Sequence, residues 1–255
     1  MRVMLIDGLN LIRRIHAGVP DPEAPAHMDG VIDAVTRSVA RALSEQNPTH
    51  AVLVMDDPDS TWRRELFPAY KQNRKPMPDD LRTHLSRVVD GIEEAGIRSV
   101  QVDGFEADDV IATMASSLGA RGIAVVVLST DKSMLGLLDA GVEVRDHFTG
   151  RSFTPQDVVT RFGVDPAQLP EFLALAGDSS QNVPGVSGIG AKTAAQLLQT
   201  HSDLGGIFAA LDALPKRHAN ALRKQAEDTD LYTRISTLRL DVDVGINLSD
   251  FRLTS

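Results

Sequence analysis

The stretch RVMLID, residues 2–7, introduces the pattern that decides the fold, because it is a short apolar run that ends in an acid. Similar runs rich in β-branched residues recur at residues 51–55, 97–102, 123–128 and 142–145. Between them lie longer segments whose apolar residues have helical spacing, at residues 31–43, 81–95 and 110–118. Apolar strands that alternate with helices indicate a mostly parallel sheet covered on both faces. We therefore predict an α/β fold.

The pattern changes after about Thr154. Helix-sized segments separated by Pro, Gly and Ser follow, as far as LRLDVDV at residues 238–244. We interpret residues 1–154 as the α/β domain and residues 155–255 as a helical lobe that is joined to it.

Composition limits the class of protein. The chain has 255 residues, 42% of them apolar and 24% charged, which is enough for one α/β core with a smaller helical lobe. No cysteine is present, so disulfides and thiolate zinc sites are excluded, and a cytoplasmic protein is favoured. No stretch reaches the about 18 apolar residues of a membrane span, and the first apolar run is too short for a secretion signal.

The net charge and the positions of the histidines indicate which partners and metal ligands to expect. The formal net charge of −9 argues against a general polyanion binder, but carboxylates of a metal site can dominate the total while basic residues gather on one surface. The seven histidines, from His16 to His218, are scattered without metal-ligand spacing. We therefore expect oxygen atoms to hold any metal.

Acids follow three of the predicted strands. Asp7, Asp56 and Asp131 come directly after, or shortly after, an apolar run. Because the carboxyl ends of strands form the ligand-binding edge of an open α/β sheet, these side chains are predicted to project to one edge. Taken singly, each acid can also be an ordinary loop residue.

The segment FEADDVIATMASSL, residues 105–118, adds Glu106, Asp108 and Asp109 at the start of a predicted helix. One acid there would cap the helix and interact favourably with its dipole, but three exceed that need. Beside the strand-end acids they would repel one another unless cations neutralised them. Oxygen ligands favour Mg²⁺ or Mn²⁺, and paired ions of this kind catalyse displacement at phosphorus.

Residues 62–75 carry more basic than acidic side chains, whereas the chain as a whole is acidic. The only acid among them is Glu65, and the cations are Arg63, Arg64, Lys71, Arg74 and Lys75. This excess predicts a surface that contacts DNA phosphates, on which Trp62 and Tyr70 would stack on bases. Lys71 or Arg74 would stabilise the charge that develops on the phosphate. A solvated helix face is the alternative.

The segment GDSSQNVPGVSGIGAKTAAQ, residues 177–196, contains a glycine-rich hairpin before a helix predicted to begin at Ala191. Free N–H groups at that helix start would hold phosphate without reading base sequence. The expected DNA contacts are Gly185, Gly188, Ile189, Gly190, Ala191, Lys192 and Thr193. A plain connection between two helices is the alternative, whereas the spacing fits neither a P-loop nor a dinucleotide fingerprint.

Carbonyl oxygens of the same hairpin suggest a monovalent cation site. The last carbonyls of the preceding helix lack helical partners and would join those of the hairpin. The predicted K⁺ ligands are the carbonyls of Leu175, Ala176, Pro184, Val186 and Ile189.

Together, five motifs resemble, in order, those of the bacterial 5′ nuclease family, which comprises the 5′-3′ exonuclease domain of DNA polymerase I and stand-alone flap endonucleases. The motifs are LIDGLNLIRRIHA, FPAYKQNRKPMPDDLR, EADDVIATMA, STDKSMLGLL and GDSSQNVPGVSGIGAKTAAQLL. As the sequence carries no polymerase domain, it most resembles the stand-alone exonuclease IX (Xni) branch of that family.

The resemblance implies a PIN-like α/β domain, a helical arch or clamp that admits the 5′ flap, and a helix-hairpin-helix element that grips duplex DNA with K⁺. The PIN-like domain maps to residues 1–154, the arch to residues 56–80 and the helix-hairpin-helix element to residues 175–200. The family cuts DNA at 5′ flaps or single-strand/double-strand junctions with divalent metals, in replication and repair, and a monomer is its default. The resemblance places the first metal on Asp7, Asp56, Glu106 and Asp108, and the second on Asp109, Asp131 and Asp178. It makes Lys71 a transition-state lysine, with Arg74 in the basic patch that follows.

Two positions depart from the family pattern. Ser133 and Gln181 replace acids of the second metal site in the usual motifs DKD and GDSSDN. Because the loss of two anionic ligands weakens a site for a hard dication, a branched-DNA binding protein with weak or vestigial nuclease activity is one alternative. A PIN-type ribonuclease is another, although it would need neither the hairpin nor the basic segment. We predict a metal-dependent 5′ flap endonuclease and 5′-3′ exonuclease.

Overall fold

The computed structural model describes residues 1–253 except 22, 23, 25, 59 and 60. Within this part of the chain, one sheet has the strand order β3-β2-β1-β4-β5. The strands are β1 (Arg2–Asp7), β2 (His50–Met55), β3 (Arg98–Gln101), β4 (Ala124–Leu128) and β5 (Glu143–Arg145). Every pair of neighbouring strands is parallel, so the predicted α/β fold with a parallel sheet is confirmed.

The side chains of β1 explain why its sequence is continuously apolar. Val3 and Leu5 pack into one hydrophobic cluster, and Met4 and Ile6 pack into another on the opposite face. Because successive side chains of a strand point to opposite faces, a strand covered on both sides needs apolar residues at every position.

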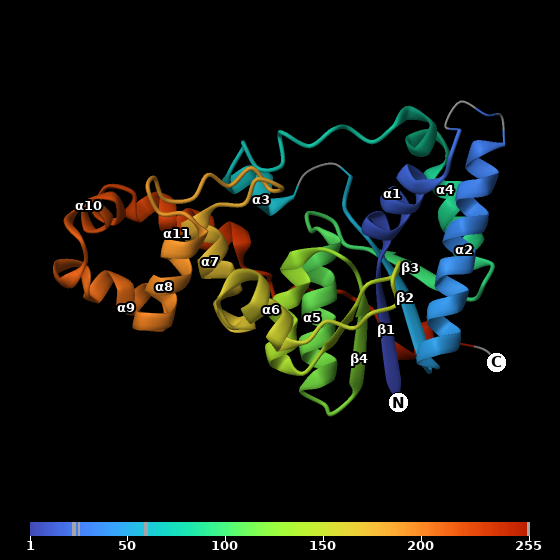
Figure 1. Ribbon diagram of the computed structural model, residues 1–255. Helices are drawn as coiled ribbons and strands as arrows, with labels where there is room; N and C mark the ends of the chain where they lie inside the picture. Colours follow the sequence, from blue (N-terminus) through green and yellow to red (C-terminus); the bar gives the residue numbers. More distant parts are fainter. Residues whose placement is uncertain (22–23, 25, 59–60, 254–255) are drawn as a thin grey trace.

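Helices cover both faces of the sheet (Figure 1). One face carries α1 (Gly8–Gly18), α2 (His27–Gln46) and α4 (Asp79–Glu93), whose apolar residues belong to the cluster of Met4 and Ile6. The opposite face carries α5 (Ala107–Gly119) and the 3-10 helix η1 (Lys132–Ala140).

The C-terminal part of the chain is helical and lies beside the sheet (Figure 1). Its α-helices are α6 (Pro155–Phe162), α7 (Leu169–Ala176), α8 (Ala191–His201), α9 (Leu204–Ala209), α10 (Lys216–Lys224) and α11 (Ala226–Ser236). Its 3-10 helices are η2 (Pro166–Gln168), η3 (Leu211–Ala213) and η4 (Leu248–Phe251). Buried residues of α7 and α8 continue the cluster under α5, so the lobe and the sheet share one core. The segment 238–244 has no regular structure, and its Val242 is buried in that core.

The basic segment links the two parts of the molecule. It begins with the short helix α3 (Trp62–Leu66) and continues as turns and extended chain to α4. In Figure 1 this chain runs from the side of the lobe across the upper end of the sheet. Within residues 56–80, where the resemblance implies a helical arch, the described helical residues are those of α3 and the first two of α4, and residues 59 and 60 lie outside the described part.

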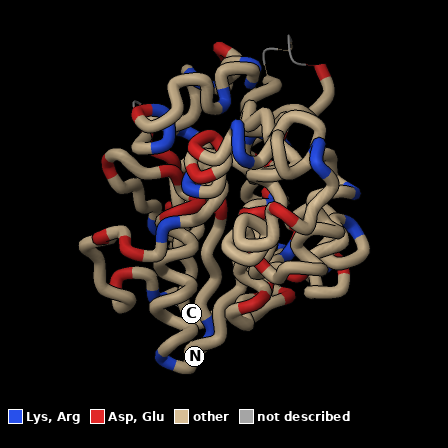
Figure 2. The backbone as a smooth tube through the Cα atoms, turned by 90° about the vertical axis from the view of Figure 1, so that its left-hand side faces the viewer, with Lys and Arg blue, Asp and Glu red and all other residues tan. Residues whose placement is uncertain are grey.

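Lys and Arg positions are interspersed with Asp and Glu positions over the face seen in Figure 2. Among the helices of the described residues, none has the length and apolar character needed to cross a membrane.

Candidate metal centre and phosphate-binding surface

The strand-end acids meet in one place. Asp7 ends β1, the central strand, and Asp56 and Asp131 follow β2 and β4 on either side of it. Together with Asp108 of α5 they line a cavity of about 350 Å³, called here the carboxylate cavity. The sheet topology therefore brings together four of the acids that the sequence singled out.

The acids of the carboxylate cavity are buried close enough to repel one another. Burial, followed by the charge of Asp56, raises the pKa of Asp7 to about 7. Burial, with the charges of Asp131 and Asp7, also raises the pKa of Asp108. The donors that face these acids include the Ser129 hydroxyl, 2.7 Å from Asp7 Oδ2. A cluster of this kind favours a bound cation.

Ser133 lies between two acids of the cavity. Its hydroxyl is 2.9 Å from Asp131 Oδ1 and 3.2 Å from Asp108 Oδ2. Its backbone N–H also donates to Asp131, which caps the start of η1. A neutral donor therefore occupies the position at which the resemblance implies a third carboxylate.

Asp178 lies in the loop after α7 and has one occupied and one unoccupied oxygen. Its Oδ1 accepts from Lys132 Nζ at 2.5 Å and from the Ser180 hydroxyl at 2.7 Å. Its Oδ2 is buried and has no hydrogen-bond partner among the described residues. Gln181, which is 4% exposed, likewise has a buried Oε1 that finds no partner in this part of the chain.

Lys71 forms one wall of the carboxylate cavity and is held by Glu106. Its Nζ is 2.5 Å from Glu106 Oε1, and the Tyr70 hydroxyl donates to Glu106 Oε2 at 2.9 Å. Burial opposes ionisation of Glu106, but Lys71 and Arg63 outweigh it and lower the pKa of this carboxyl. The Lys71 backbone has a φ of 55° and its N–H donates to the Gln181 carbonyl. Glu106 thus anchors the lysine, and it does not line the cavity itself.

The prediction that Arg63 contacts DNA is wrong, because this arginine is 2% exposed. Its guanidinium donates to both oxygens of Asp109, at 2.6 and 2.8 Å, and its Nε donates to the Ile235 carbonyl. Asp109 also accepts from the Trp62 indole and from the Arg239 backbone. Four donors thus satisfy the two oxygens of Asp109, which does not line the carboxylate cavity, so we do not place it among the metal ligands.

The aromatic residues of the basic segment are also structural. Tyr70 is buried, so the prediction that it stacks on bases is wrong. Trp62 is half-buried and tied to Asp109 through its indole N–H. Of the two arginines expected to contact DNA, only Arg64 is exposed, and its role stays a prediction.

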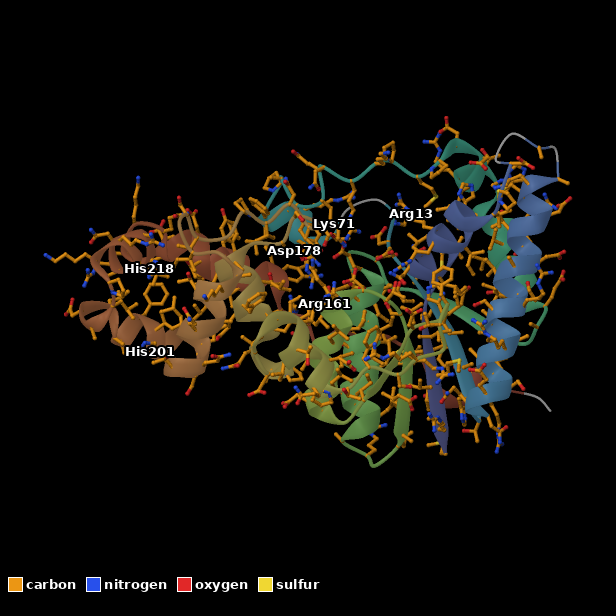
Figure 3. The ribbon with its side chains drawn as sticks, in the orientation of Figure 1. Arg13, Lys71, Arg161, Asp178, His201 and His218 are labelled. Carbon is orange, nitrogen blue, oxygen red and sulfur yellow. The ribbon has the colours of Figure 1, made fainter. Side chains whose placement is uncertain are left out.

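Sequence reasoning missed two arginines that line the carboxylate cavity. Arg13 and Arg14 of α1 lie there together with Lys71, Arg74 and Lys75. Arg13 donates to the Lys75 carbonyl at 3.0 Å, which connects α1 to the basic segment. Figure 3 shows Arg13 and Lys71 on the same side of the sheet as Asp178. Their spacing could have revealed them. Arg13 and Arg14 follow Asn10, another cavity residue, by three and four positions, and residues at this spacing share a helix face.

The glycine hairpin folds back tightly on the end of α7. The Val186 N–H donates to the Leu175 carbonyl, and a Cβ atom at Gly185 would lie 2.4 Å from the backbone nitrogen of Gly177. Helix α8 begins at Ala191, as expected, and its first residues are exposed. Of the expected DNA contacts in the hairpin, Gly188, Gly190, Ala191 and Lys192 are exposed, whereas Gly185 and Ile189 are buried.

A second, larger cavity of about 560 Å³ lies between α8 and the loop after α7 that carries Asp178. Its polar wall includes Lys132, Asp178, Arg161 and Lys192. Lys132, which lines this second cavity, directly follows Asp131, which lines the carboxylate cavity.

The histidines show no metal-ligand spacing along the chain, but the structure brings two of them together with an acid. His16, His27 and Asp80 bring one ligand atom each to within 4.8 Å of one another. Three separate segments supply them, which is why spacing along the chain gave no sign of the cluster.

Comparisons with known proteins agree over the whole chain. A family profile described as 5′-3′ exonuclease, N-terminal resolvase-like domain, matches residues 2–163, and one described as 5′-3′ exonuclease, C-terminal SAM fold, matches residues 164–255. The chain is 39% identical to flap endonuclease Xni of Vibrio campbellii, over 100% of this chain and 97% of the relative. It is 37% identical to flap endonuclease Xni of Shewanella amazonensis, over 99% and 98% of the two chains.

Solved structures show the same fold. The zinc-bound T5 5′-exonuclease superposes with a TM-score of 0.78 at 22% identity, over 92% of this chain and 89% of that one. The catalytic core of Rad2 in complex with a DNA substrate has a TM-score of 0.62 at 16% identity, over 99% and 83%. Because both profiles and the full-length relatives span the sheet, the carboxylate cavity and the hairpin, this chain belongs to the 5′-3′ exonuclease family.

Proposed function

We propose that the protein is a divalent-metal-dependent 5′ flap endonuclease and 5′-3′ exonuclease that hydrolyses DNA phosphodiesters at flaps or single-strand/double-strand junctions. The carboxylate cavity is the main support, because four acids face cationic side chains across a space open to a phosphate. The cations are Arg13, Arg14, Lys71, Arg74 and Lys75. The curated relatives named flap endonuclease Xni support the same activity.

The donor set of the cavity fits hard divalent ions. Asp7, Asp56, Asp108 and Asp131 would hold the first ion, since all offer carboxylate oxygens and the pKa values of the first three are raised. Asp178 would hold the second through its unpartnered Oδ2. Mg²⁺ or Mn²⁺ matches oxygen ligands best and, when bound, would supply an activated water and neutralise phosphate charge.

The chain's own cations then bind and orient the phosphate. Lys71 presents its ammonium at the cavity wall, where the ion pair with Glu106 fixes its position. This position suits stabilisation of the charge that develops on phosphate oxygens during hydrolysis. Arg13 and Arg74 approach from two different segments and would hold neighbouring phosphates.

The hairpin would grip the duplex beside the cut site. The exposed N–H groups at the start of α8 and the Lys192 ammonium form an anion-binding surface. The carbonyls of Ala176, Pro184 and Ile189 receive no backbone hydrogen bond from the described residues, so they have lone pairs for a K⁺ ion. We include this ion in the proposal, and expect duplex affinity to fall when tetramethylammonium replaces K⁺ at constant ionic strength. An unchanged affinity for duplex DNA after this exchange would contradict the proposed K⁺ site.

Cleavage of a labelled 5′-flap DNA with Mg²⁺ or Mn²⁺ tests the activity. Asp108→Asn should abolish cleavage while flap binding is retained, and Asp103→Asn, which changes an exposed acid of the preceding loop, should cleave like the wild type. Wild-type protein that binds the flap but forms no more product than Asp108→Asn would contradict the nuclease proposal.

Such a result would favour a second candidate, a branched-DNA binding protein with weak nuclease activity. The Lys132 ammonium on Asp178, together with Ser133 and Gln181 in place of acids, supports this candidate. Each of these features reduces the negative charge available to a second divalent ion.

A further inference from the structure

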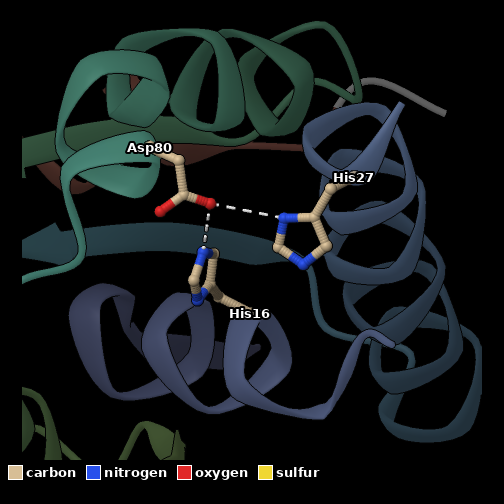
Figure 4. Close-up of side chains that lie close together, drawn as sticks. All are labelled: His16, His27 and Asp80. Carbon is tan, nitrogen blue, oxygen red and sulfur yellow. Dashed lines mark hydrogen bonds and ion pairs between the residues drawn. The ribbon is translucent and has the colours of Figure 1, made fainter. Parts of the chain in front are cut away.

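Three side chains of metal-ligand type meet on the helical face that carries α1, α2 and α4 (Figure 4). His16 lies in the last turn of α1, His27 begins α2, and Asp80 lies in the first turn of α4. Asp80 Oδ2 is 2.9 Å from His16 Nε2 and 3.3 Å from His27 Nδ1. None of the three lines the carboxylate cavity, so the nuclease chemistry does not account for them.

His27 is the unsatisfied member of this group. The residue is 5% exposed, its Nε2 has no hydrogen-bond partner among the described residues, and its Nδ1 has the 3.3 Å contact with Asp80 but no hydrogen bond in this part of the chain. Its ring packs edge-on against His16, with 5.0 Å between the ring centroids, so both imidazoles face the same small space. A buried ring nitrogen without a hydrogen bond is unfavourable, and a cation shared between His27 Nδ1 and Asp80 Oδ2 would satisfy that nitrogen.

We propose that His16, His27 and Asp80 form a binding site for Zn²⁺ or a similar transition metal ion, separate from the carboxylate cavity. Two imidazoles and one carboxylate are a common zinc ligand set, whereas Mg²⁺ prefers oxygen ligands alone. Ligand atoms around a tetrahedral zinc lie about 3.3 Å apart, given bond lengths of about 2.0 Å. The Asp80–His27 distance has this value already, and Asp80, at 35% side-chain exposure, leaves room for water as a fourth ligand.

The position of the site gives it a structural role. The ion would join the end of α1 and the start of α2 to the start of α4, where the basic segment ends. His16 lies one helical turn after Arg13, which bonds to the Lys75 carbonyl of that segment. A metal bound here would therefore fix the far end of the segment that carries Lys71 and Arg74.

Zinc binding in the presence of saturating Mg²⁺ tests the proposal. X-ray absorption of the zinc-loaded protein should show imidazole ligands, which the carboxylate cavity cannot supply because no histidine is among its lining residues. His27→Gln and Asp80→Asn should each remove this signal and weaken the zinc affinity. Removal of an outer-shell partner costs about 10–100-fold, and loss of a direct ligand should cost at least as much. His84→Gln, one turn after Asp80 on α4, is the matched control and should bind zinc as the wild type does.

Thermal unfolding gives a second measurement on the same proteins. Zn²⁺ should raise the Tm of the wild type and of His84→Gln, but not that of His27→Gln or Asp80→Asn. A zinc spectrum with oxygen ligands only, or an equal affinity and Tm response in all four proteins, would overturn the proposal. If both substitutions prevent folding, the imidazole signal of the wild type decides the question alone.

Discussion

Replacement of Asp7 by asparagine is expected to stabilise the metal-free protein at pH 8. Asp7 is buried in the carboxylate cavity, and burial together with the charge of Asp56 raises its pKa from 3.8 to about 7. The unfolded chain loses this proton near pH 4, whereas the folded protein keeps it until about pH 7. Over that interval the folded state binds more protons, so its stability falls as the pH rises.

The size of the effect follows from the shift. A pKa raised from 3.8 to about 7, at about 1.36 kcal/mol for each pKa unit, costs the folded protein about 4 kcal/mol at pH 8 and about 2 kcal/mol at pH 5. Asparagine avoids this cost but weakens the hydrogen bond from Ser129, which removes about 1.5 kcal/mol of the gain. The net gain is therefore about 3 kcal/mol at pH 8 and close to zero at pH 5. For a chain of this size, about 3 kcal/mol raises the Tm by roughly 6–12 °C.

Calorimetric unfolding in the presence of a chelator, at pH 5 and pH 8, measures this difference. Asp103→Asn, which removes an exposed acid of the same charge, should leave the Tm within about 2 °C at both pH values. Added Mg²⁺ should raise the Tm of the wild type at pH 8 and have little effect on Asp7→Asn. The reasoning fails if Asp7→Asn lowers the Tm at pH 8, or if its gain is equal at the two pH values.

Four further substitutions test other parts of the site. Lys71→Met should lower kcat by about 100–1000-fold with flap binding retained, and a change confined to KM would speak against a transition-state role. Arg63→Met should reduce stability in urea by about 3–5 kcal/mol, because it leaves a buried charge on Asp109, and a loss below about 1 kcal/mol would contradict the pair's structural role. Gly185→Ala, at φ 75°, should cost about 1–3 kcal/mol of thermal stability, and an unchanged Tm would refute the close approach to Gly177. Gln181→Asp should raise the cleavage rate at low Mg²⁺, and equal rates across a Mg²⁺ titration would exclude it as a ligand position.

The sheet and its acids were predictable because both depend on local patterns. Continuous apolar runs such as residues 123–128 can be buried only where helices cover both faces. In a parallel sheet all strands end at the same edge, so an acid after β1 and one after β2 must lie close together. No knowledge of side-chain packing was required for either inference.

The basic segment could not be divided correctly from the sequence. Arg63 and Arg74 are equivalent as members of a run of cations, yet one is buried and the other lines the carboxylate cavity. The difference comes from distant partners, because Asp109 and the Ile235 carbonyl surround Arg63. The histidine group was missed for the same reason, since three helices supply its members.

The structure also explains how Gln181 can replace an acid without disturbing the basic segment. The contacts between the two loops use backbone carbonyls: Lys71 N–H donates to Gln181, Arg74 Nε to Ser180, and Asn73 to Ser179. A change of side chain at position 181 leaves these carbonyls in place.

The charge of the proposed second metal position can therefore vary while Lys71 stays where it is. Glu106, at the start of α5, also holds the Lys71 ammonium, and this contact does not involve residue 181. If the loop binds the proposed second metal, its side chains would set the metal affinity, whereas its backbone carbonyls hold the segment that carries Lys71. Because of this separation, Gln181→Asp should change the dependence of cleavage on Mg²⁺. The loss of kcat caused by Lys71→Met at saturating Mg²⁺ should be the same with either residue at position 181.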